Sequence, residues 1–336
     1  MPANLTPQYL AAEQRFKEAK TPQEKVERLE EMLATIPKHK GTEKLQADLK
    51  RRLAKLRDES EKKHGSAKGA YLYTVPREGA GQVLLVGAPN TGKSKLLARL
   101  TKAAPEIADY PFTTQRPQPG MMNFEDIQIQ LVDMPPVAAE NYEPWMGGII
   151  RQSDLVLLVA DLGSAEVLDE IVEVTKTLEG SRIRLVSAAF ERDDDTAAAV
   201  LPTILVANKS DHPLASESLP ILTEFFGATF EIHAVSAEIG HGLEELRRIV
   251  FQKLRVIRVY TKAPGKKLDP NSTPFVLKEG STVLDAARAV HRDFTHTLKF
   301  ARLWSPERPG RKAEYTGQMA DRNHELEDGD ILELHV

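Results

Sequence analysis

The chain has 336 residues with a formal net charge of −4 at pH 7, and 41% of its residues are hydrophobic. This length predicts two or three domains in an ordinary globular protein, while the absence of cysteine excludes disulfide bonds, thiolate catalysis and cysteine-based zinc sites. We expect a cytoplasmic protein, because the start lacks a signal-peptide pattern and no apolar run approaches the ~18 residues of a membrane span.

The charge is distributed unevenly over three segments. Residues 1–80 carry a net charge of +5, residues 81–256 a net charge of −10 and residues 257–336 a net charge of +1. We interpret them as an N-terminal helical arm with its linker, a nucleotide-binding domain and a small C-terminal domain. Because phosphate backbones attract cations, contacts with nucleic acid are expected from the flanking segments and not from the acidic middle.

The first 80 residues predict three helices. Threonine–proline pairs at residues 6–7 and 21–22 each place a capping residue before a proline, which suits the first helical turn. A long helix is expected at residues 42–63, with leucines on one face, so that it forms an antiparallel hairpin with the helix before it. Its other face carries Lys50, Arg51, Arg52, Lys55 and Arg57. We give equal weight to two interpretations of these cations: they form a solvated helix face, or they contact the phosphate backbone of an RNA.

A phosphate-binding loop is predicted at residues 87–94, which match the pattern G-x-x-x-x-G-K-[ST] between an apolar strand pattern and a helical pattern. Backbone N–H groups of such a loop surround phosphates, and the following helix N-terminus adds positive potential. Lys93 is expected to reach the β- and γ-phosphates, and Ser94 to bind Mg²⁺. The loop consists of Gly87, Ala88, Pro89, Asn90, Thr91, Gly92, Lys93 and Ser94.

Two downstream residues are candidate metal ligands. In the irregular segment 109–114 we expect Thr114 to bind Mg²⁺ when a γ-phosphate holds the segment in place. An alternating strand pattern at residues 127–132 ends at Asp133, whose carboxylate is placed to hold Mg²⁺ through water.

The residues after Asp133 depart from the usual Asp-x-x-Gly pattern, in which the glycine N–H donates to the γ-phosphate. Pro136 occupies the glycine position, and proline has no N–H. Because a hydrogen bond to a charged group contributes roughly 1.5–3 kcal/mol, GTP and GDP are expected to be distinguished less sharply than in a typical switch. Val137 stands where some GTPases have a water-orienting glutamine, and its side chain cannot position water.

A guanine-recognition motif follows at Asn208-Lys209-Ser210-Asp211. Asp211 can accept hydrogen bonds from guanine N1–H and the 2-amino group, whereas adenine would leave this buried carboxylate unpaired. Sites built in this way can discriminate by ~10⁴–10⁵. Backbone N–H groups at Ser236 and Ala237 can meet guanine O6. At this spacing after a phosphate-binding loop, the motif favours GTP and argues against an ATPase.

The last 80 residues predict a ubiquitin-like β-grasp domain. Strand patterns lie at residues 256–260, 274–277, 300–304 and 330–334, and Ser281-Thr282 caps a helix after the second. The cations of its loops are contacts for a partner or, with equal weight, ordinary exposed charge. The candidate contacts are Lys262, Lys266, Lys267, Arg308, Arg311 and Lys312.

With these motifs in place, the chain resembles the Obg-like GTPases, and within them the developmentally regulated (DRG) branch. The likeness is carried by Lys40-Gly41-Thr42-Glu43 with residues 45–53, by Arg77-Glu78-Gly79 with residues 80–83, by residues 87–94 and by residues 110–114. The last 80 residues resemble the TGS domain, on residues 259–262, 264–266, 280–283 and 328–330. The resemblance implies a ribosome-associated GTPase of translation or ribosome assembly. Position 136 lacks the family's glycine, and the interval 133–208 looks too short for the subdomain that eukaryotic members insert.

The predicted fold class is therefore α/β, with a GTPase domain on a mostly parallel sheet, an N-terminal helical hairpin and a C-terminal β-grasp domain. We expect GTP hydrolysis by positioning and electrostatics, with Lys93 and Thr114 in catalytic roles. In related GTPases an asparagine at the position of Asn90 binds K⁺, which predicts K⁺ stimulation here. The alternative is a guanine-nucleotide-dependent binding scaffold that scarcely hydrolyses GTP. Pro136 and Val137 replace the glycine N–H and the water-orienting glutamine that usually contribute to hydrolysis.

Overall fold

The structure is a computed structural model that describes residues 32, 35, 75–101, 116–187, 198–269, 272–307 and 315–336. Its contacts divide the chain into two units, Met1–Thr74 and Val75–Val336. In the first unit the described residues are Met32 and Thr35, both helical. The rest of residues 1–74, which contains the predicted helices, lies outside the described residues, and so do Thr114, Arg308, Arg311 and Lys312.

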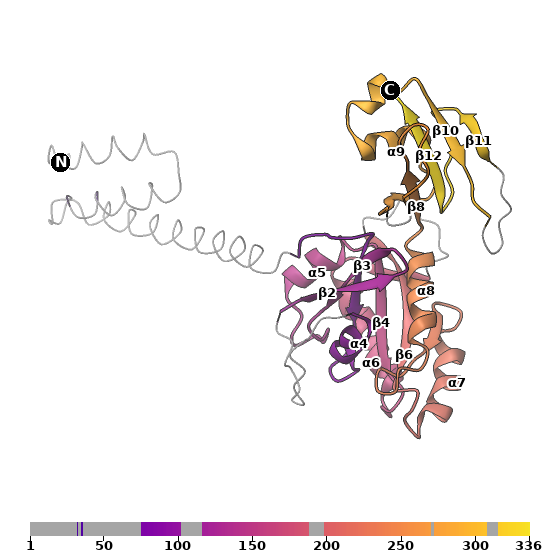
Figure 1. Cartoon of the computed structure of the whole chain (residues 1–336). Helices are drawn as coiled ribbons and strands as arrows, with labels where there is room; N and C mark the ends of the chain where they lie inside the picture. The colour runs from indigo at the N-terminus through magenta and orange to yellow at the C-terminus, as the bar shows by residue number, and fades with distance from the viewer. Residues whose placement is uncertain are drawn as a thin grey trace. The chain divides into compact units, whose positions relative to one another are not determined.

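A mostly parallel sheet forms the centre of the nucleotide domain (Figure 1). Its strands are β1 (Gln82–Val86), β2 (Gln118–Phe124), β3 (Ile127–Asp133), β4 (Leu155–Asp161), β5 (Ile183–Ser187), β6 (Ala199–Asn208) and β7 (Glu231–Ala234). They pair in the order β2-β3-β1-β4-β6-β5, and β7 also pairs with β6. The hairpin of β2 and β3 is antiparallel, and the other pairs are parallel. The apolar run that predicted β1 is buried along its whole length, as a central strand requires.

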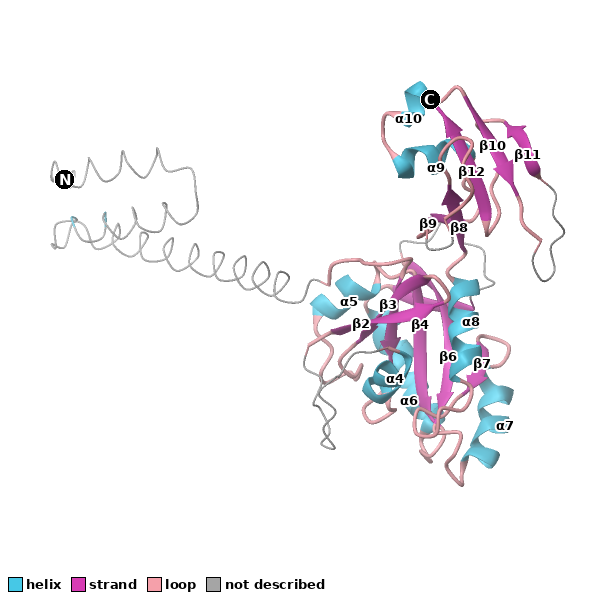
Figure 2. Cartoon of the chain, in the orientation of Figure 1, coloured by secondary structure: helices cyan, strands magenta, loops and turns pink. Residues whose placement is uncertain are grey.

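Helices cover both faces of this sheet (Figure 2). On one face, α4 (Lys93–Leu100) and α8 (Leu243–Lys253) bury leucine and isoleucine side chains against β1, β3 and β4. On the other face lie α5 (Pro144–Ile150), α6 (Val167–Gly180) and α7 (Ala215–Phe226). Within the described part of the chain, none of the helices has both the length and the apolar character that crossing a membrane requires.

The parallel register places the predicted motifs at one edge of the sheet. In the pairing of β1 with β3, Leu85 lies opposite Asp133, and in the pairing of β4 with β6, Asp161 lies opposite Asn208. The phosphate-binding loop follows β1 at this same edge. Ligands of open α/β sheets bind outside the carboxyl ends of the strands, so the topology gathers the predicted site residues there.

A second sheet makes the C-terminal domain. Its strands are β8 (Val256–Thr261), β9 (Phe275–Lys278), β10 (Phe300–Trp304), β11 (Thr316–Ala320) and β12 (Asp330–His335), in the order β11-β10-β12-β8-β9. The helix α9 (Val283–Val290) packs on one face, and Thr282 begins it with a capping box to Asp285. A short helix, α10 (Phe294–Thr297), follows.

These two sheets confirm the predicted α/β class, with a mostly parallel sheet in the nucleotide domain and a separate sheet in the C-terminal domain. The strand β11 and the helix α10 were not predicted from the sequence. β11 has the sequence Thr-Gly-Gln-Met-Ala, in which Thr316 is the only residue of the β-branched and aromatic kinds that mark a strand. It forms because β10 offers an unpaired edge, with Ala301 opposite Ala320 and Arg302 opposite Met319.

Candidate nucleotide-binding site

Two glycines of the phosphate-binding loop are required by close contacts. A Cβ on Gly87 would lie 2.4 Å from the carbonyl oxygen of Val159 in β4. Gly92 has a φ of +88°, and a Cβ there would lie 2.4 Å from Nδ2 of Asn208. Both distances are too short for a carbon contact, and a positive φ is itself unfavourable for other residues. The loop therefore needs glycine for packing against β4 and β6 as well as for its path around phosphates.

Lys93 is held by the loop that it follows. Its side chain is buried, and Nζ donates hydrogen bonds to the carbonyl oxygens of Ala88, at 2.7 Å, and Gly87, at 3.1 Å. Burial lowers the pKa of Lys93 to about 8, against the opposing effect of the negative charges of Asp133 and Glu170. The ammonium group thus occupies an apolar environment with uncharged acceptors, and an anionic phosphate would stabilise its charged form.

The two predicted Mg²⁺ ligands that the structure describes lie together. The hydroxyl of Ser94 donates to Oδ2 of Asp133 at 2.5 Å, across 39 positions of sequence. Asp133 is fully buried at the end of β3. Among the described residues no cluster of three His, Asp or Glu side chains could hold a metal ion by itself. A hydroxyl and one carboxylate nevertheless fit Mg²⁺, which takes oxygen ligands and completes its shell with phosphates and water.

The segment after Asp133 is fastened to β1 and to the phosphate-binding loop. The N–H of Met134 donates to the carbonyl oxygen of Leu85, and the N–H of Val137 donates to that of Gly87, each at 3.1 Å. The two residues between them are prolines, which have no N–H. Each backbone N–H of residues 134–137 is therefore already bonded within the protein. The side chain of Val137 is 1% exposed and packs in the core under α5 and α6, away from any solvent that it could orient.

Asn208 connects the phosphate side of the site to the base side. Its buried side chain donates through Nδ2 to the carbonyl oxygen of Thr91, at 2.9 Å, and accepts at Oδ1 from the N–H of Ala237, at 3.1 Å. The next residue, Lys209, has a φ of +62°, and its ammonium group pairs with Asp161 at 2.5 Å. Asn208 thus holds the geometry of the motif by bridging the phosphate-binding loop and the loop that follows β7.

The carboxylate of Asp211 is ready to accept hydrogen bonds. The Ser236 hydroxyl donates to it, and this hydrogen bond lowers the pKa of Asp211 below its ordinary value. Contrary to the sequence expectation of a buried carboxylate, Asp211 is exposed to solvent. The amides predicted to meet guanine O6 are also engaged in the protein, because Ser236 N–H donates to the carbonyl oxygen of His241 and Ala237 N–H to Asn208. Contact of these two amides with a base stays a prediction.

Two charged groups of the site were missed by sequence reasoning. Glu170 in α6 accepts a hydrogen bond from Ser164 at 2.7 Å, and its charge acts on Lys93, which lies 77 positions earlier. Arg99 in α4 donates from Nε to the carbonyl oxygen of Ala237 at 2.8 Å and so holds the loop that follows β7. Neither residue belongs to a local motif, because each acts on a residue that is distant in the sequence and is brought near only by the fold.

Two family models match the chain. A model described as 50S ribosome-binding GTPase matches residues 82–209, and a model of the TGS domain matches residues 257–336. An uncharacterised GTP-binding protein of Methanocaldococcus jannaschii is 30% identical, over 94% of this chain and 93% of its own. Developmentally-regulated G-protein 2 of Arabidopsis thaliana is 27% identical, over 93% and 90%. Ribosome-interacting GTPase 1 of Saccharomyces cerevisiae is 26% identical, over 93% and 98%.

Proposed function

The chain belongs to the developmentally regulated family of GTP-binding proteins, and from this premise we propose that it is a slow, Mg²⁺-dependent GTPase associated with the ribosome or another RNA in the cytoplasm. We propose a role in translation or ribosome assembly. The observation that carries the proposal is the 2.5 Å contact between Ser94 and Asp133 beside the buried ammonium group of Lys93. A hydroxyl, a carboxylate and a cation at one sheet edge are what a Mg²⁺–triphosphate requires.

In this proposal the residues divide into a phosphate side and a base side. On the phosphate side, residues 87–94 surround the phosphates, and Ser94, Thr114 and Asp133 hold Mg²⁺. The metal ion, when bound, neutralises charge on the β- and γ-phosphate oxygens. On the base side, Asp211 accepts from guanine N1–H and the 2-amino group. Asn208 positions the base-side loop through its bond to Ala237.

Stimulation by K⁺ is a further part of the proposal. Asn90 is exposed and has a φ of +61°, so its side chain stands at the surface of the loop where a monovalent cation has access. With Val137 in the core, the segment after Asp133 brings no side chain to the attacking water. A cation at Asn90 would then supply transition-state charge that no described arginine supplies from this segment.

Association with the ribosome is supported by the name of the yeast relative, a ribosome-interacting GTPase, and by the TGS domain. The basic residues of the N-terminal arm and of the C-terminal domain are the proposed contacts, because the nucleotide domain is acidic.

The experiment that tests this function is GTP turnover in K⁺ and in Na⁺, each with and without ribosomes. Turnover that is faster in K⁺ than in Na⁺, and faster with ribosomes than without, is the expected result. An Asn90→Ala variant should lose the difference between K⁺ and Na⁺ while it still binds GDP. Equal turnover in K⁺ and Na⁺ would contradict the proposed role of Asn90. Displacement of GTP by equimolar ATP would contradict the proposed specificity for guanine.

A second candidate function is favoured by the bonded amides of residues 134–137. Since none of them is open to a γ-phosphate, the chain could act as a guanine-nucleotide-dependent binding scaffold with little hydrolysis. Negligible turnover in all four conditions, together with tight GTP binding, would select the scaffold.

A further inference from the structure

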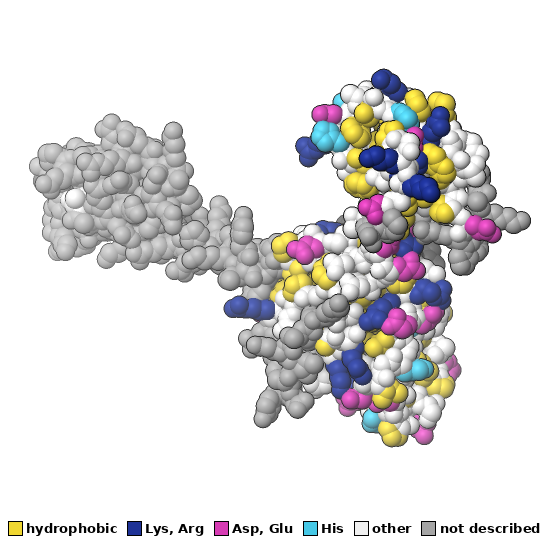
Figure 3. Space-filling view, viewed as in Figure 1, with side chains coloured by type: hydrophobic (Ala, Val, Ile, Leu, Met, Phe, Trp, Pro, Cys, Tyr) yellow, Lys and Arg dark blue, Asp and Glu magenta, His cyan; other side chains and the backbone are white. Residues whose placement is uncertain are grey.

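The sheet of the C-terminal domain has one face that α9 does not cover. Alternate side chains along β8, β10 and β12 point to the two faces, and those that include Val259, Leu303 and Leu332 pack with α9 in the core. The other face carries Trp304 and Ile331, which lie opposite each other across β10 and β12. Figure 3 shows Lys and Arg side chains interspersed with apolar side chains on the visible surface of this domain.

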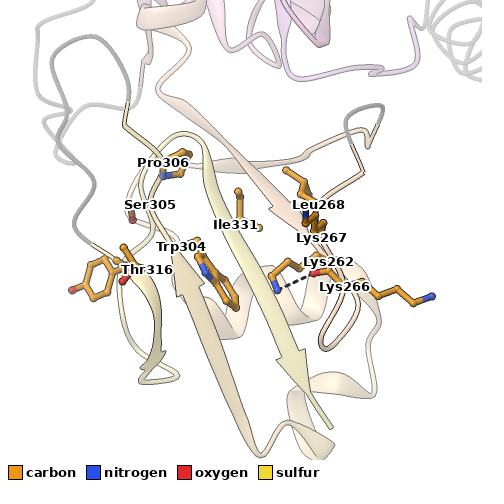
Figure 4. Close-up of a pocket in the computed structure, with 10 residues that line it drawn as sticks. Lys262, Lys266, Lys267, Leu268, Trp304, Ser305, Pro306, Thr316 and Ile331 are labelled. Carbon is orange, nitrogen blue, oxygen red and sulfur yellow. Dashed lines mark hydrogen bonds between the residues drawn. The ribbon is translucent and has the colours of Figure 1, made fainter.

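A cavity of about 420 Å³ opens at this face (Figure 4). Its wall is mostly apolar and includes Leu268, Trp304, Pro306, Tyr315 and Ile331. This volume falls within the ~300–1,000 Å³ of typical ligand sites, which combine apolar walls with a few polar groups. The lysines lie along one side of the cavity in Figure 4, with Trp304 and Thr316 across from them.

One of these lysines is part of the wall and not a contact for a ligand. Nζ of Lys262 lies 3.8 Å from the centre of the Trp304 ring and 2.5 Å from Oε2 of Glu333. The side chains of Lys262 and Glu333 are 12% and 6% exposed. The hydrogen bond from Lys262 lowers the pKa of Glu333 to about 2, so Glu333 presents a carboxylate to the Lys262 side chain, and His335 contacts the other carboxylate oxygen at 2.7 Å. Lys262 therefore orients the indole ring, which differs from its expected role as a contact to RNA.

The two neighbouring lysines are different. Lys266 and Lys267 are exposed at the rim of the cavity, and no ion pair with either is found among the residues that the structure describes. Gly317 brings the backbone of β11 against the indole, because it has a φ of +109° and a Cβ there would lie 2.8 Å from the ring. The cavity thus has an aromatic wall held from two sides and exposed positive charge at one rim.

We propose that this cavity takes an unpaired base of single-stranded RNA, with the base against Trp304 and the adjoining phosphates against Lys266 and Lys267. Aromatic side chains beside a basic rim are the combination that single-stranded nucleic acid requires. A duplex keeps its bases stacked inside and inserts one only at the cost of unpairing and unstacking it, a few kcal/mol. The inference rests on the RNA association proposed above, and it names the site, the strandedness of the RNA and the residues involved.

The test uses the full chain with Trp145→Phe, because the chain has two tryptophans and this change leaves Trp304 as the only one. The probe is an eight-nucleotide single-stranded RNA of mixed sequence, with the same sequence as a duplex for comparison. We expect saturable quenching of Trp304 fluorescence by the single strand and at least tenfold weaker binding of the duplex. Because these variants lack the indole signal, their binding is measured through the anisotropy of a fluorescein-labelled strand. Trp304→Ala should weaken binding roughly 5- to 150-fold, and Trp304→Phe, which keeps an aromatic face, should weaken it much less.

A matched pair of lysine variants tests the rim. Lys267→Gln should reduce the slope of log affinity against log salt by about 0.7, the value of one lost phosphate contact on a single strand. Lys299→Gln removes the same charge from an exposed position next to the opposite end of β10 and should leave the slope unchanged. Cooperative thermal unfolding of each variant shows that it is folded.

Four outcomes would overturn the proposal: no RNA binding, RNA binding without quenching of Trp304, equal affinity for the duplex, or equal losses from Trp304→Phe and Trp304→Ala. GDP affinity is measured on the same preparations. Intact GDP binding with any of these outcomes would remove the RNA site and leave the proposed GTPase in place, whereas loss of GDP binding in the parent chain would remove the GTPase assignment. The first of these outcomes, together with quenching of Trp304 by an aromatic peptide, would show that the cavity takes a protein segment instead of RNA.

Discussion

Lys93 in the nucleotide domain and Lys262 in the C-terminal domain are both largely buried, yet the chain compensates their charges differently. Lys93 is surrounded by carbonyl oxygens, and the carboxylates of Asp133 and Glu170 act on it only through their fields. Lys262 has a carboxylate in direct contact, that of Glu333, and an indole ring beneath it.

This difference shows which of the two buried lysines can bind an anionic ligand. A cation held by uncharged acceptors in an apolar site gains stability when an anion arrives, and the lowered pKa of Lys93 records this. A cation already paired with a carboxylate has nothing to gain from a phosphate, because the phosphate would compete with the partner. Burial and positive charge therefore indicate an anion site only when the compensating charge is missing.

The largest expected effect comes from Lys93→Ala. If its ammonium group contacts the β- and γ-phosphates, the variant loses two hydrogen bonds to charged groups at roughly 1.5–3 kcal/mol each, and GTP affinity should fall ~100-fold or more. The measurement is titration of a fluorescent GTP analogue. Lys95→Gln is the matched control, because Lys95 follows on the same helix, is exposed and pairs with Glu238. Equal losses of GTP affinity in the two variants would contradict a specific role of Lys93 in phosphate binding.

The next effect is on stability and belongs to Lys262. Glu333→Gln should destabilise the C-terminal domain by about 3 kcal/mol, because it leaves a buried ammonium group without its counter-charge. Unfolding followed through Trp304 fluorescence, in the Trp145→Phe background, measures this domain. Glu325→Gln, at an exposed position before β12, is the control and should change stability by less than ~0.5 kcal/mol. A loss from Glu333→Gln no larger than this would mean that Lys262 is already compensated elsewhere.

Of the fold, the sequence was sufficient for elements whose signal is local. The apolar runs of β1 and β4 and the capping residue Thr282 of α9 identify their elements without reference to neighbours. β11 could not be found in this way, because its strand conformation is imposed by the edge of β10. Its glycine, Gly317, serves contact with Trp304 and looks like a turn signal in the sequence.

Of the nucleotide site, the residue types were predictable but their partners were not. Spacing identified Ser94 and Asp133, and the structure brings them into contact. The engagement of Asn208 with both Thr91 and Ala237 depends on the packing of three loops, which no linear pattern encodes. Lys262 and Glu333 are 71 positions apart, so their pairing could not be predicted from the sequence. Sequence reasoning therefore made Lys262 a candidate contact for RNA, whereas the fold pairs it with Glu333.

A third prediction concerns the γ-phosphate, which Lys93 is expected to contact without a second donor from the segment after Asp133. Since residues 134–137 offer no amide to a γ-phosphate, Pro136→Gly should supply one and raise the preference for GTP over GDP. The expected gain is roughly 1.5 kcal/mol, the lower end for a hydrogen bond to a charged group, because the new N–H also costs backbone freedom. Competition between GTP and GDP measures it, and Pro135→Ala is the control. An unchanged GTP-to-GDP ratio would show that the missing N–H does not limit discrimination.

A fourth prediction follows from the pKa of Lys93, which is about 8 in the folded chain and 10.5 in a model peptide. Above pH 8 nucleotide binding must take up a proton, so GDP affinity should fall by up to about tenfold per pH unit. In the same range the unfolded chain binds more protons than the folded one, so the stability of the nucleotide-free protein should rise. Measurements between pH 7 and 9 detect both trends, and Lys93→Ala should lack the rise in stability.

The smallest effect is expected from replacing the Lys262–Glu333 pair as a whole. Lys262→Met with Glu333→Leu removes both charges at once, and methionine keeps a favourable contact with the indole ring. Buried ion pairs exchanged for apolar residues of similar size often leave stability unchanged, so the double variant should stay closer to the parent than Glu333→Gln does. The loss that remains comes from His335 and the N–H of Gly265, which also contact the Glu333 carboxylate. The salt dependence of RNA binding should also be unchanged. A slope reduced as far as in Lys267→Gln would show that Lys262 does reach a phosphate, and the two buried lysines would then be alike.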